Sequence, residues 1–525
     1  MYYGNMIISA MNDVTITWWI VISALALLAV KMVDDNSKRK KRSQNFRSPP
    51  GPKGYPILGI FPSLIRKPAH IVFGEWSKKY GNVYQFTLGA GTSVVLGDTA
   101  TVRLAMLGKS PDFDSRCQWR YCFNKMFRGL SVLPYSFKWV NTRRRTLTIL
   151  RNIGMGRSLM EGKIHEETQC LLKCMLDSSQ DGKVNFEPRD MLRRAPMNTI
   201  WSILFGKRYD YSNPYLLYVM NTVVWLVDFL AKASVFDVLP SSLRHLAGFS
   251  LETFHNKLET LHAFMTERVD DHAKSYESDV TRDFVDAWIK AKKEDKLKIQ
   301  DSEDSNDISS LPDVIQDLIV AGAHSTGIVF NWAVLLLVLN KKEQDLCYRE
   351  IMDNVGPTRE ISMSDRSKLR RVDAVMHECM RIGTVLPLVA HATARDTTIH
   401  GYNIKAGTEV IYNNWFINRN EKVFPDAEKF NPDRWIKKDG SFRKELLQHF
   451  FPFGIGKRSC AGESLARANL FIVVATLLQR VELLPPDETA SPEMLPEVKH
   501  QFGLLAECKP FLMRVRCRPT FVPSQ

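Results

Sequence analysis

Residues 451–462 read Phe-Pro-Phe-Gly-Ile-Gly-Lys-Arg-Ser-Cys-Ala-Gly, and this stretch carries one thiol, Cys460. Glycines on both sides of a cysteine let the backbone pass close to a flat, bulky ligand. They also free amide N–H groups to point at the sulfur, which favours the thiolate. Arg458 can pair with a carboxylate, and the aromatic ring of Phe453 can cover one face of a ligand. The stretch therefore predicts a metal or cofactor thiolate at Cys460, whereas a lone cysteine is more often a buried structural thiol.

The spacing within this stretch is F-x-x-G-x-R-x-C-x-G, which ends at Gly462. With this pattern the sequence resembles the cytochrome P-450 family of haem-thiolate monooxygenases, in its microsomal animal type. Two upstream motifs agree in order: Glu-Cys-Met-Arg from Glu378 to Arg381 matches E-x-x-R, and 430–435, with Arg434, matches the family's P-E-R-F-like segment. Residues three apart share a helix face, so Glu378 and Arg381 can form an ion pair. The resemblance implies a buried triad with Arg434; the alternative is a surface pair and an unrelated arginine.

The resemblance extends from Pro49 to about Arg518 and implies a mainly helical fold with a small β region. It places haem b (iron protoporphyrin IX) between a long central helix and the Cys460 loop, with Cys460 as the iron ligand. Two carboxylates on a buried ring need cationic or N–H partners. For His391 alone, a histidine satisfied within the core is the alternative. The cofactor-binding residues that the resemblance implies are Trp139, Arg143, His391, Phe453, Arg458 and Gly462.

A long apolar segment is predicted to form a core helix from a cap at Ser310 to Asn340. It contains Ala-Gly-Ala-His-Ser-Thr at 321–326, where the family has A-G-x-(D/E)-T-T. In the family the acid and the alcohol help deliver protons to bound oxygen, and here His324 and Ser325 occupy those positions. A histidine can relay protons near neutral pH, and a serine hydroxyl can donate. We therefore predict His324, Ser325 and Thr326 as catalytic residues; alternatively, His324 only packs or faces solvent.

The remaining elements follow from local patterns. Residues 82–88 and 92–96 predict two strands joined by a Gly-Ala-Gly turn, and residues 397–410 predict a hairpin. The charge-dense stretch 290–307 predicts a solvated loop.

By family position, the substrate pocket includes the segment 119–133 and several apolar side chains. These imply a small lipophilic substrate such as a steroid, a fatty acid or a xenobiotic, although apolar residues there would be core under any interpretation. The pocket residues predicted in this way are Ala321, Leu388, Val389 and Leu504.

The N-terminal region predicts a membrane anchor. Residues 14–33 (VTITWWIVISALALLAVKMV) span about 30 Å as a helix, and basic residues follow them. The positive-inside rule then predicts a lumenal N-terminus at 1–13, one membrane span at 14–33 and a cytosolic remainder, in which 34–56 is a basic and proline-rich hinge. The resemblance implies that the membrane is that of the endoplasmic reticulum and that residues 57–525 form the haem-thiolate catalytic domain. A cleaved signal peptide is the alternative, but no positive region precedes the segment and no small-residue cleavage site is evident after it.

The net charge of +14 favours an anionic partner. No zinc-finger spacing or single-stranded-RNA motif is present, so nucleic acid is not expected. Nine scattered cysteines argue against a disulfide framework. The chain has no G-x-G-x-x-G, which fits NADPH binding elsewhere. The resemblance implies electrons from an NADPH-dependent diflavin reductase, which carries the flavins, with cytochrome b5 as a further candidate donor. The side chains predicted near this partner are Arg143, Arg144, Arg145 and Lys457, with a solvated face as the alternative for Arg144 and Arg145.

The resemblance thus implies a membrane-bound monooxygenase that inserts one oxygen atom of O2 into a small lipophilic substrate. Two alternatives stay open. His324 motivates the first, a haem-thiolate isomerase or dehydratase that needs neither O2 nor a reductase. The second is a non-catalytic haem-binding or sensor protein.

Overall fold

The computed structural model of this 525-residue chain describes residues 47–56, 58–89, 91–154, 158–233, 251–298 and 310–519. The predicted anchor at 14–33, the segment 1–13 and most of the hinge at 34–56 lie outside the described residues. Contacts divide the chain into two units, of which the smaller comprises Met1–Pro49 and Thr398–Ile404. In its described part, the Asn403 N–H donates to the Arg47 carbonyl at 2.8 Å, and the Arg47 guanidinium lies 5.0 Å from the Tyr402 ring.

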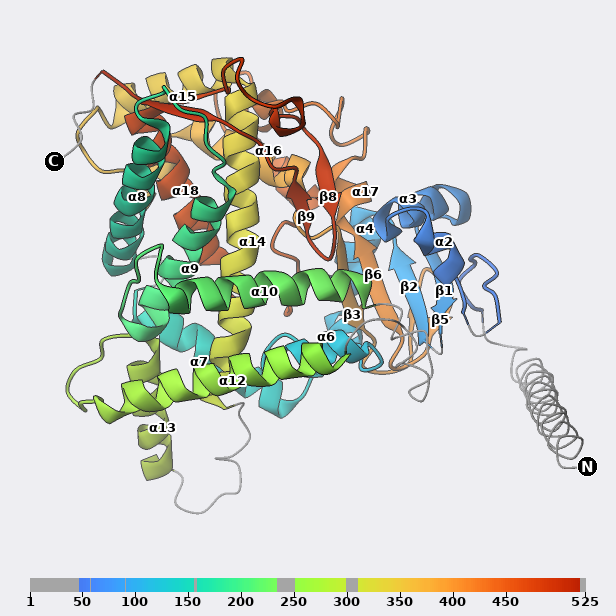
Figure 1. The fold of residues 1–525 in the computed structure, drawn as a ribbon. Coiled ribbons are helices and arrows are strands. Elements are labelled where there is room, and N and C mark those ends of the chain that lie inside the picture. The colour runs from blue at the N-terminus through green and yellow to red at the C-terminus, as the bar shows by residue number, and fades with distance from the viewer. Residues whose placement is uncertain are drawn as a thin grey trace, which may run out of the picture. The chain divides into compact units, whose positions relative to one another are not determined.

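The larger unit, Pro50–Thr397 with Lys405–Gln525, is mainly helical (Figure 1). This confirms the predicted fold class. Its helices are α2 (Phe61–Ile65), α3 (Ala69–Tyr80), α4 (Thr99–Arg103), α5 (Ser110–Phe113), α6 (Tyr121–Met126), α7 (Phe137–Asn152), α8 (Ser158–Ser179), α9 (Arg189–Phe205), α10 (Pro214–Lys232), α12 (Leu251–Lys274), α13 (Phe284–Lys298), α14 (Leu311–Leu339), α15 (Lys341–Asn354), α16 (Arg370–Gly383), α17 (Asn414–Asn418) and α18 (Glu463–Arg480). Short 3-10 or π turns are η1 (Leu104–Gly108), η4 (Met363–Ser367), η5 (Pro432–Trp435), η6 (Lys444–His449) and η7 (Pro492–Met494).

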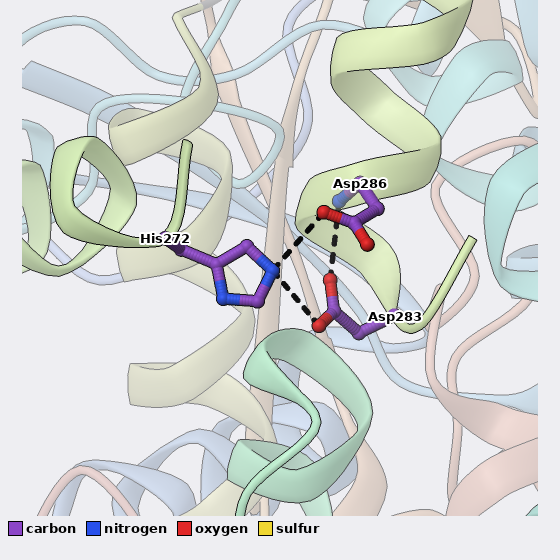
Figure 2. Close-up of side chains that lie close together, drawn as sticks. All are labelled: His272, Asp283 and Asp286. Atoms are coloured by element: carbon purple, nitrogen blue, oxygen red, sulfur yellow. Dashed lines mark hydrogen bonds and ion pairs between the residues drawn. The ribbon is translucent and has the colours of Figure 1, made fainter. Parts of the chain in front are cut away.

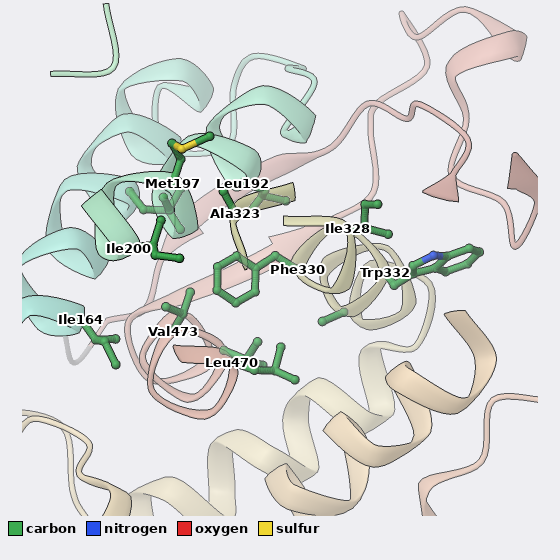
Figure 3. Packing of buried hydrophobic residues seen from close by; sticks show 14 of the residues in the cluster. Ile164, Leu192, Met197, Ile200, Ala323, Ile328, Phe330, Trp332, Leu470 and Val473 are labelled. Atoms are coloured by element: carbon green, nitrogen blue, oxygen red, sulfur yellow. The ribbon is translucent and has the colours of Figure 1, made fainter. Parts of the chain in front are cut away.

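Helix α14 is the predicted core helix, and its cap is confirmed: the Ser310 side chain accepts from the Asp313 N–H. Both α14 and α10 are long and apolar enough to span a membrane, but 78% of the apolar window of α14 is buried. Side chains of α9, α14 and α18 interdigitate around Phe330 (Figure 3). At Gly327 a Cβ would lie 2.9 Å from the Arg193 Cα, so glycine allows α9 to approach α14 closely. This crossing brings the polar face of α9 next to residues 321–326 of α14, which carry the predicted catalytic residues and are called the oxygen-side segment below.

The main sheet has the strand order β1-β2-β6-β3. Strands β1 and β2 are antiparallel, β2 and β6 are parallel, and β6 and β3 are antiparallel. The predicted strands at 82–88 and 92–96 are confirmed as β1 and β2. The strands are β1 (Val83–Leu88), β2 (Gly91–Leu96), β3 (Leu388–Ala392), β4 (Thr397–Ile399), β5 (Tyr402–Ile404), β6 (Glu409–Asn413), β7 (Val481–Leu484), β8 (His500–Phe502), β9 (Ala506–Cys508) and β10 (Arg514–Cys517).

The predicted hairpin at 397–410 is wrong in extent. Only β4 and β5 form a hairpin, and it ends at Ile404. The positive φ angles of His400 (47°) and Gly401 (77°) make its turn tight. The chain then enters β6, every residue of which is buried, because β6 lies between β2 and β3 in the main sheet.

The predicted loop at 290–307 is also wrong in part, since α13 continues to Lys298. Phe284, Val285 and Trp288 are buried and anchor the first turns of this helix. Lys292 and Lys293 are exposed, so this charged stretch is solvated while it is helical.

Candidate functional site

Cys460 lies in a tight loop that leads into α18. The Cys460 N–H donates to the Phe453 carbonyl at 2.8 Å, and the Ser459 N–H donates to the Gly456 carbonyl at 3.1 Å. Gly456 has φ +81°, and a Cβ there would lie 2.5 Å from the Met106 carbonyl oxygen. Because a side chain would meet both strain and a clash, this position requires glycine. Gly462 is the N-cap residue of α18.

Cys460 keeps accessible surface. All nine cysteines lie in the described part of the chain, and Cys460 alone is exposed. Enough protein still surrounds the sulfur that burial raises the pKa of this thiol, while the Gly462 N–H and the Arg143 guanidinium act in the opposite direction. Two groups that favour the thiolate are therefore already in place beside the sulfur.

Three guanidinium groups, those of Arg116, Arg143 and Arg458, gather near the Cys460 loop together with His391. Burial and then Arg116 lower the pKa of Arg458 to about 8, and burial lowers the pKa of Arg116 to about 10. Burial, Arg116 and Arg458 hold the pKa of His391 well below its usual value. These shifts mean that the groups repel one another in a poorly solvated place.

The hydrogen bonds of these arginines end mainly on backbone carbonyls. Arg458 Nε donates to Asp114 O at 2.6 Å, Arg143 Nη2 donates to Ser459 O at 2.7 Å, and Arg116 Nε donates to Ser131 O at 2.9 Å. Within the described residues, no carboxylate lies within ion-pair distance of any of the three guanidiniums. A carboxylate-bearing ligand would supply the missing negative charge, so these residues fit the two propionates of a haem.

Trp139 and His391 both contact backbone carbonyls. The indole N–H of Trp139 donates to Leu130 O at 3.1 Å, and the Arg458 guanidinium lies 3.8 Å from its ring. His391 Nδ1 lies 3.3 Å from Phe113 O. Trp139 thus supports Arg458 by stacking. Arg116 was not among the predicted residues, because it belongs to no recognisable motif.

The Glu378 carboxylate joins the two predicted arginines, and Glu378 and Arg381 are fully buried. Arg381 Nη2 lies 2.7 Å and Arg434 Nε lies 2.9 Å from Glu378 Oε1. The indole N–H of Trp435 also donates to Glu378 Oε2 at 2.9 Å, a partner that the motifs did not indicate. This satisfied network joins α16 to η5.

The oxygen-side segment of α14 has an open face and a buried face. Ala321 is exposed and Ser325 is half-buried, while His324 and Thr326 are buried. The Ser325 hydroxyl donates to Ala321 O at 2.7 Å, and the Thr326 hydroxyl donates to Gly322 O at 2.8 Å. His324 Nε2 lies 3.1 Å from Glu507 Oε1 of β9, and sequence patterns gave no sign of this carboxylate.

The predicted pocket residues keep accessible surface. Leu388 and Val389 of β3 and Leu504, between β8 and β9, are all half-buried. A cavity of about 570 Å³ has α12 on one side and, on the other, α6 with the segment that follows it. The second side belongs to the predicted pocket segment 119–133. The lining of the cavity mixes rings with charged groups: Tyr121, Asn124, Lys125, Phe127, Arg128, Val132, His255, Leu258 and Glu259.

The predicted basic face is divided. Arg144 and Lys457 are exposed. Arg145 is half-buried, and its guanidinium lies 5.6 Å from the Trp288 ring of α13. Only Arg144 and Lys457 are therefore well placed to meet a partner protein.

A second polar cluster lies at the junction of α12 and α13 (Figure 2). His272 Nε2 lies 3.0 Å from Asp283 Oδ2 and 3.2 Å from Asp286 Oδ1. Arg282 also binds Asp286, through Nε at 2.6 Å and Nη2 at 2.9 Å. Because Arg282 and His272 can balance both carboxylates, an ion-pair cluster explains this arrangement without a metal ion.

Comparisons with known proteins agree with this site. The family model described as Cytochrome P450 matches residues 49–513. The chain is 30% identical to human cytochrome P450 2J2 over 492 residues, which cover 91% of this chain and 94% of the relative. It is 31% identical to rabbit (Oryctolagus cuniculus) cytochrome P450 2C3 over 480 residues, which cover 90% of this chain and 94% of the relative.

Proposed function

The chain belongs to the cytochrome P450 family and is a monooxygenase-type oxidoreductase, and on this premise we propose that it is a membrane-bound enzyme acting on a small lipophilic substrate. It would insert one oxygen atom of O2 into that substrate, with electrons from an NADPH-dependent diflavin reductase. The observation that carries the proposal is that Cys460, an exposed residue, lies beside the buried Arg458 and the half-buried Arg116 and Arg143, which lack carboxylates at ion-pair distance among the described residues.

The family implies haem, and the residues present fit it. Cys460 would ligate the iron, with Phe453 and Gly462 in its loop, while Arg116, Arg143, Arg458 and His391 would hold the propionates. When bound, haem would supply dioxygen activation, and a cysteine thiolate ligand favours O–O cleavage. The chain's own task on the proximal side is to keep the thiolate aligned, which the Gly462 N–H and Arg143 do.

The open face of α14 carries Ala321 and Ser325, and these residues would border the haem where dioxygen binds. The Ser325 hydroxyl can donate a hydrogen bond there, with Thr326 one residue further and His324 behind. We assign these three residues to proton supply. The small side chain of Ala321 would leave room for dioxygen next to the haem, whereas a side chain at Gly322 would meet Ile200 of α9.

The proposed substrate is lipophilic, because Ala321, Leu388, Val389 and Leu504 offer apolar surface. The cavity between α6 and α12 carries Lys125 and the ion pair between Arg128 and Glu259, whose atoms lie 2.6 Å apart. We propose this cavity as a route into the pocket, and its charged lining favours a substrate that also bears a polar group.

The reductase, and cytochrome b5 as a second donor, are proposed to bind the side that carries Arg144 and Lys457, since electron-transfer partners with acidic surfaces are attracted to exposed cations. The predicted anchor at 14–33 would hold the cytosolic domain, 57–525, at the endoplasmic reticulum membrane by a single span, through the hinge at 34–56. The resemblance of the sequence to the microsomal animal type of the family supports this location.

The proposal is tested with purified full-length protein, haem and reductase in lipid vesicles. We expect the red-shifted Soret band of a thiolate-ligated haem in the reduced carbon monoxide complex, and NADPH-dependent product formation with a panel of steroids and fatty acids. Cys460→Ala should lose this band, while Cys517→Ala, a half-buried cysteine on β10, should keep it. A retained band in Cys460→Ala would overturn the ligand assignment.

The same experiment separates the alternative functions. Turnover of a hydroperoxide without NADPH or reductase would favour an isomerase or dehydratase. Haem uptake without turnover of any tested compound would favour a haem-binding protein without catalytic activity.

A further inference from the structure

Position 324, where the family motif has an acid, holds a histidine, yet a carboxylate lies next to it. His324 Nε2 is 3.1 Å from Glu507 Oε1, although Glu507 belongs to β9, a different part of the chain. No aligned hydrogen bond joins Nε2 to a partner among the described residues, so the observation is the close approach of the two groups. The His324 side chain is 3% exposed and the Glu507 side chain is 18% exposed.

Glu507 is held as a fixed anion. Its Oε2 accepts from Arg193 Nη2 and lies 3.7 Å from Arg189 Nη1, both on α9. Burial alone would raise the pKa of Glu507, but contact with His324 and the charges of Arg193 and Arg189 lower it to about 2. One oxygen therefore faces the arginines, and the other faces the imidazole.

A fixed anion of this kind is a poor proton carrier near neutral pH, because its pKa is far from the pH. It can, however, orient an imidazole and stabilise its cation, as a carboxylate does in a catalytic triad. An ionised carboxylate can only accept hydrogen bonds, so Glu507 favours a proton on the nearby Nε2 of His324. Nδ1 is then the ring nitrogen that is left to exchange its proton. His324 directly precedes Ser325, whose hydroxyl lies on the partly open face of α14.

We propose that Glu507 is a positioning residue for oxygen activation: it supplies, from β9, the negative charge that position 324 lacks, and it holds His324 as the proton donor behind Ser325. The inference rests on the proposed monooxygenase function. In each transfer one proton leaves Nδ1 toward the Ser325 side, and one proton from solvent replaces it. The electrons come from NADPH through the reductase.

Arg193 and Arg189 have a defined part in this arrangement. Gly327 lets α9 approach α14, and this approach places both arginines against Glu507. They keep the carboxylate ionised, so that it does not take the proton from His324. The acid of the helix is thus replaced by residues from three elements, namely α14, β9 and α9.

The test measures NADPH oxidation and hydrogen peroxide release by the haem-loaded full chain with reductase and O2. Glu507→Gln keeps the size of the side chain and removes its charge. We expect a rise of about threefold or more in peroxide released per NADPH, because poorly timed proton delivery lets reduced oxygen escape. Glu507→Asp should recover part of the loss. Glu482→Gln, an exchange of a β7 glutamate that pairs with Lys341, is the matched control and should change nothing.

The decisive variant restores the acid to the helix. His324→Glu with Glu507→Gln carries one carboxylate at position 324 and none at 507, and it should release less peroxide per NADPH than Glu507→Gln alone. A purely structural role for Glu507 predicts no such recovery. The inference is overturned if Glu507→Gln releases as much peroxide per NADPH as the unmodified protein. It is also overturned if the variant with both changes releases more peroxide per NADPH than either His324→Glu or Glu507→Gln alone.

A second readout does not depend on turnover. Thermal unfolding should be measured for His324→Gln, for Glu507→Gln and for the variant that combines these two glutamine changes. Their losses in thermal midpoint should not add, because the two residues share one interaction. Additive losses would contradict the pairing. If the unmodified protein consumes no NADPH with reductase, the proposed function itself fails; if it does and the Glu507 variants behave normally, only the present inference fails.

Discussion

At the residue scale, Gly456 shows how strictly the Cys460 loop is built. A Cβ at Gly456 would lie 2.5 Å from Met106 O at φ +81°, whereas at Gly440, with φ +77°, a Cβ would meet nothing within 4 Å. Gly456→Ala is therefore expected to lower haem incorporation strongly, because the loop must move. Gly440→Ala should cost only backbone strain, about 1 kcal/mol.

The measurement is the haem content per chain, with the thermal midpoint as a check on folding. Comparable haem content in the two alanine variants would show that the clash at Gly456 is relieved without moving Cys460.

At this scale the candidate residues came from short motifs read together with the family resemblance. Cys460, Arg458 and the pair Glu378–Arg381 stand at the intervals of those motifs, and the structure brings Glu378 and Arg381 together. Arg116 and Glu507 could not be found in this way, because each meets its partners only through packing of distant elements. A sequence pattern holds no information on such meetings unless the fold is already given.

At the element scale, Asp317 ties α14 to the segment that follows α6. Its buried carboxylate accepts from the N–H groups of Arg128, Gly129 and Ser131 at 3.1, 3.3 and 2.9 Å. Burial raises the pKa of Asp317 to about 6, so the cost of desolvating the carboxylate offsets part of the stability that these hydrogen bonds contribute. Asp317→Ala would leave three N–H groups without an acceptor and should destabilise the fold by about 2–3 kcal/mol.

Thermal or urea unfolding of haem-loaded protein would measure this loss, with Asp228→Ala, an exposed aspartate on α10, as the control. The segment 128–131 borders the cavity between α6 and α12, so protease cleavage there should also accelerate. Equal stability of the two variants would show that water replaces the lost acceptor.

Elements were predicted well where local signals coincide. The cap at Ser310 and a continuous apolar run specified α14, and alternation specified β1 and β2. The end of α13 was missed because its anchoring residues, Phe284 and Trp288, precede the charged stretch that dominated the pattern. Strand β6 was merged with a hairpin because its pairing with β2 is a long-range contact.

At the scale of the whole molecule, buried histidines make stability depend on acidity. His70 is buried against Trp415 and Phe502, and burial, Arg419 and His500 lower its pKa from 6.5 to about 4. The unfolded chain then binds a proton more readily than the folded chain, so stability falls as pH drops from about 6.5 toward 4. Between pH 7 and pH 5 this one group should cost about 1–2 kcal/mol.

His70→Phe removes the titrating group, and His70 Nε2 has no hydrogen-bond partner in the described part of the chain. The variant should therefore lose less in its thermal midpoint between pH 7 and pH 5 than the unmodified protein does. His165→Phe, a half-buried site on α8, should leave the acid sensitivity unchanged. An unaltered pH dependence in His70→Phe would place the acid sensitivity in other groups.

The parallel pairing of β2 with β6 also sets an order of events during synthesis. Ser93 pairs with Glu409 in register, so the hairpin of β1 and β2 leaves the ribosome long before its neighbour exists. At roughly 5–20 residues per second, the wait lasts about 15–60 s. During that time the edge of β2 is open to pairing with other chains, and cellular chaperones that cover such edges would decide how much of the newly made chain survives. Cys460, the proposed iron ligand, is synthesised after β6, so haem uptake through this residue would follow the synthesis of both strands.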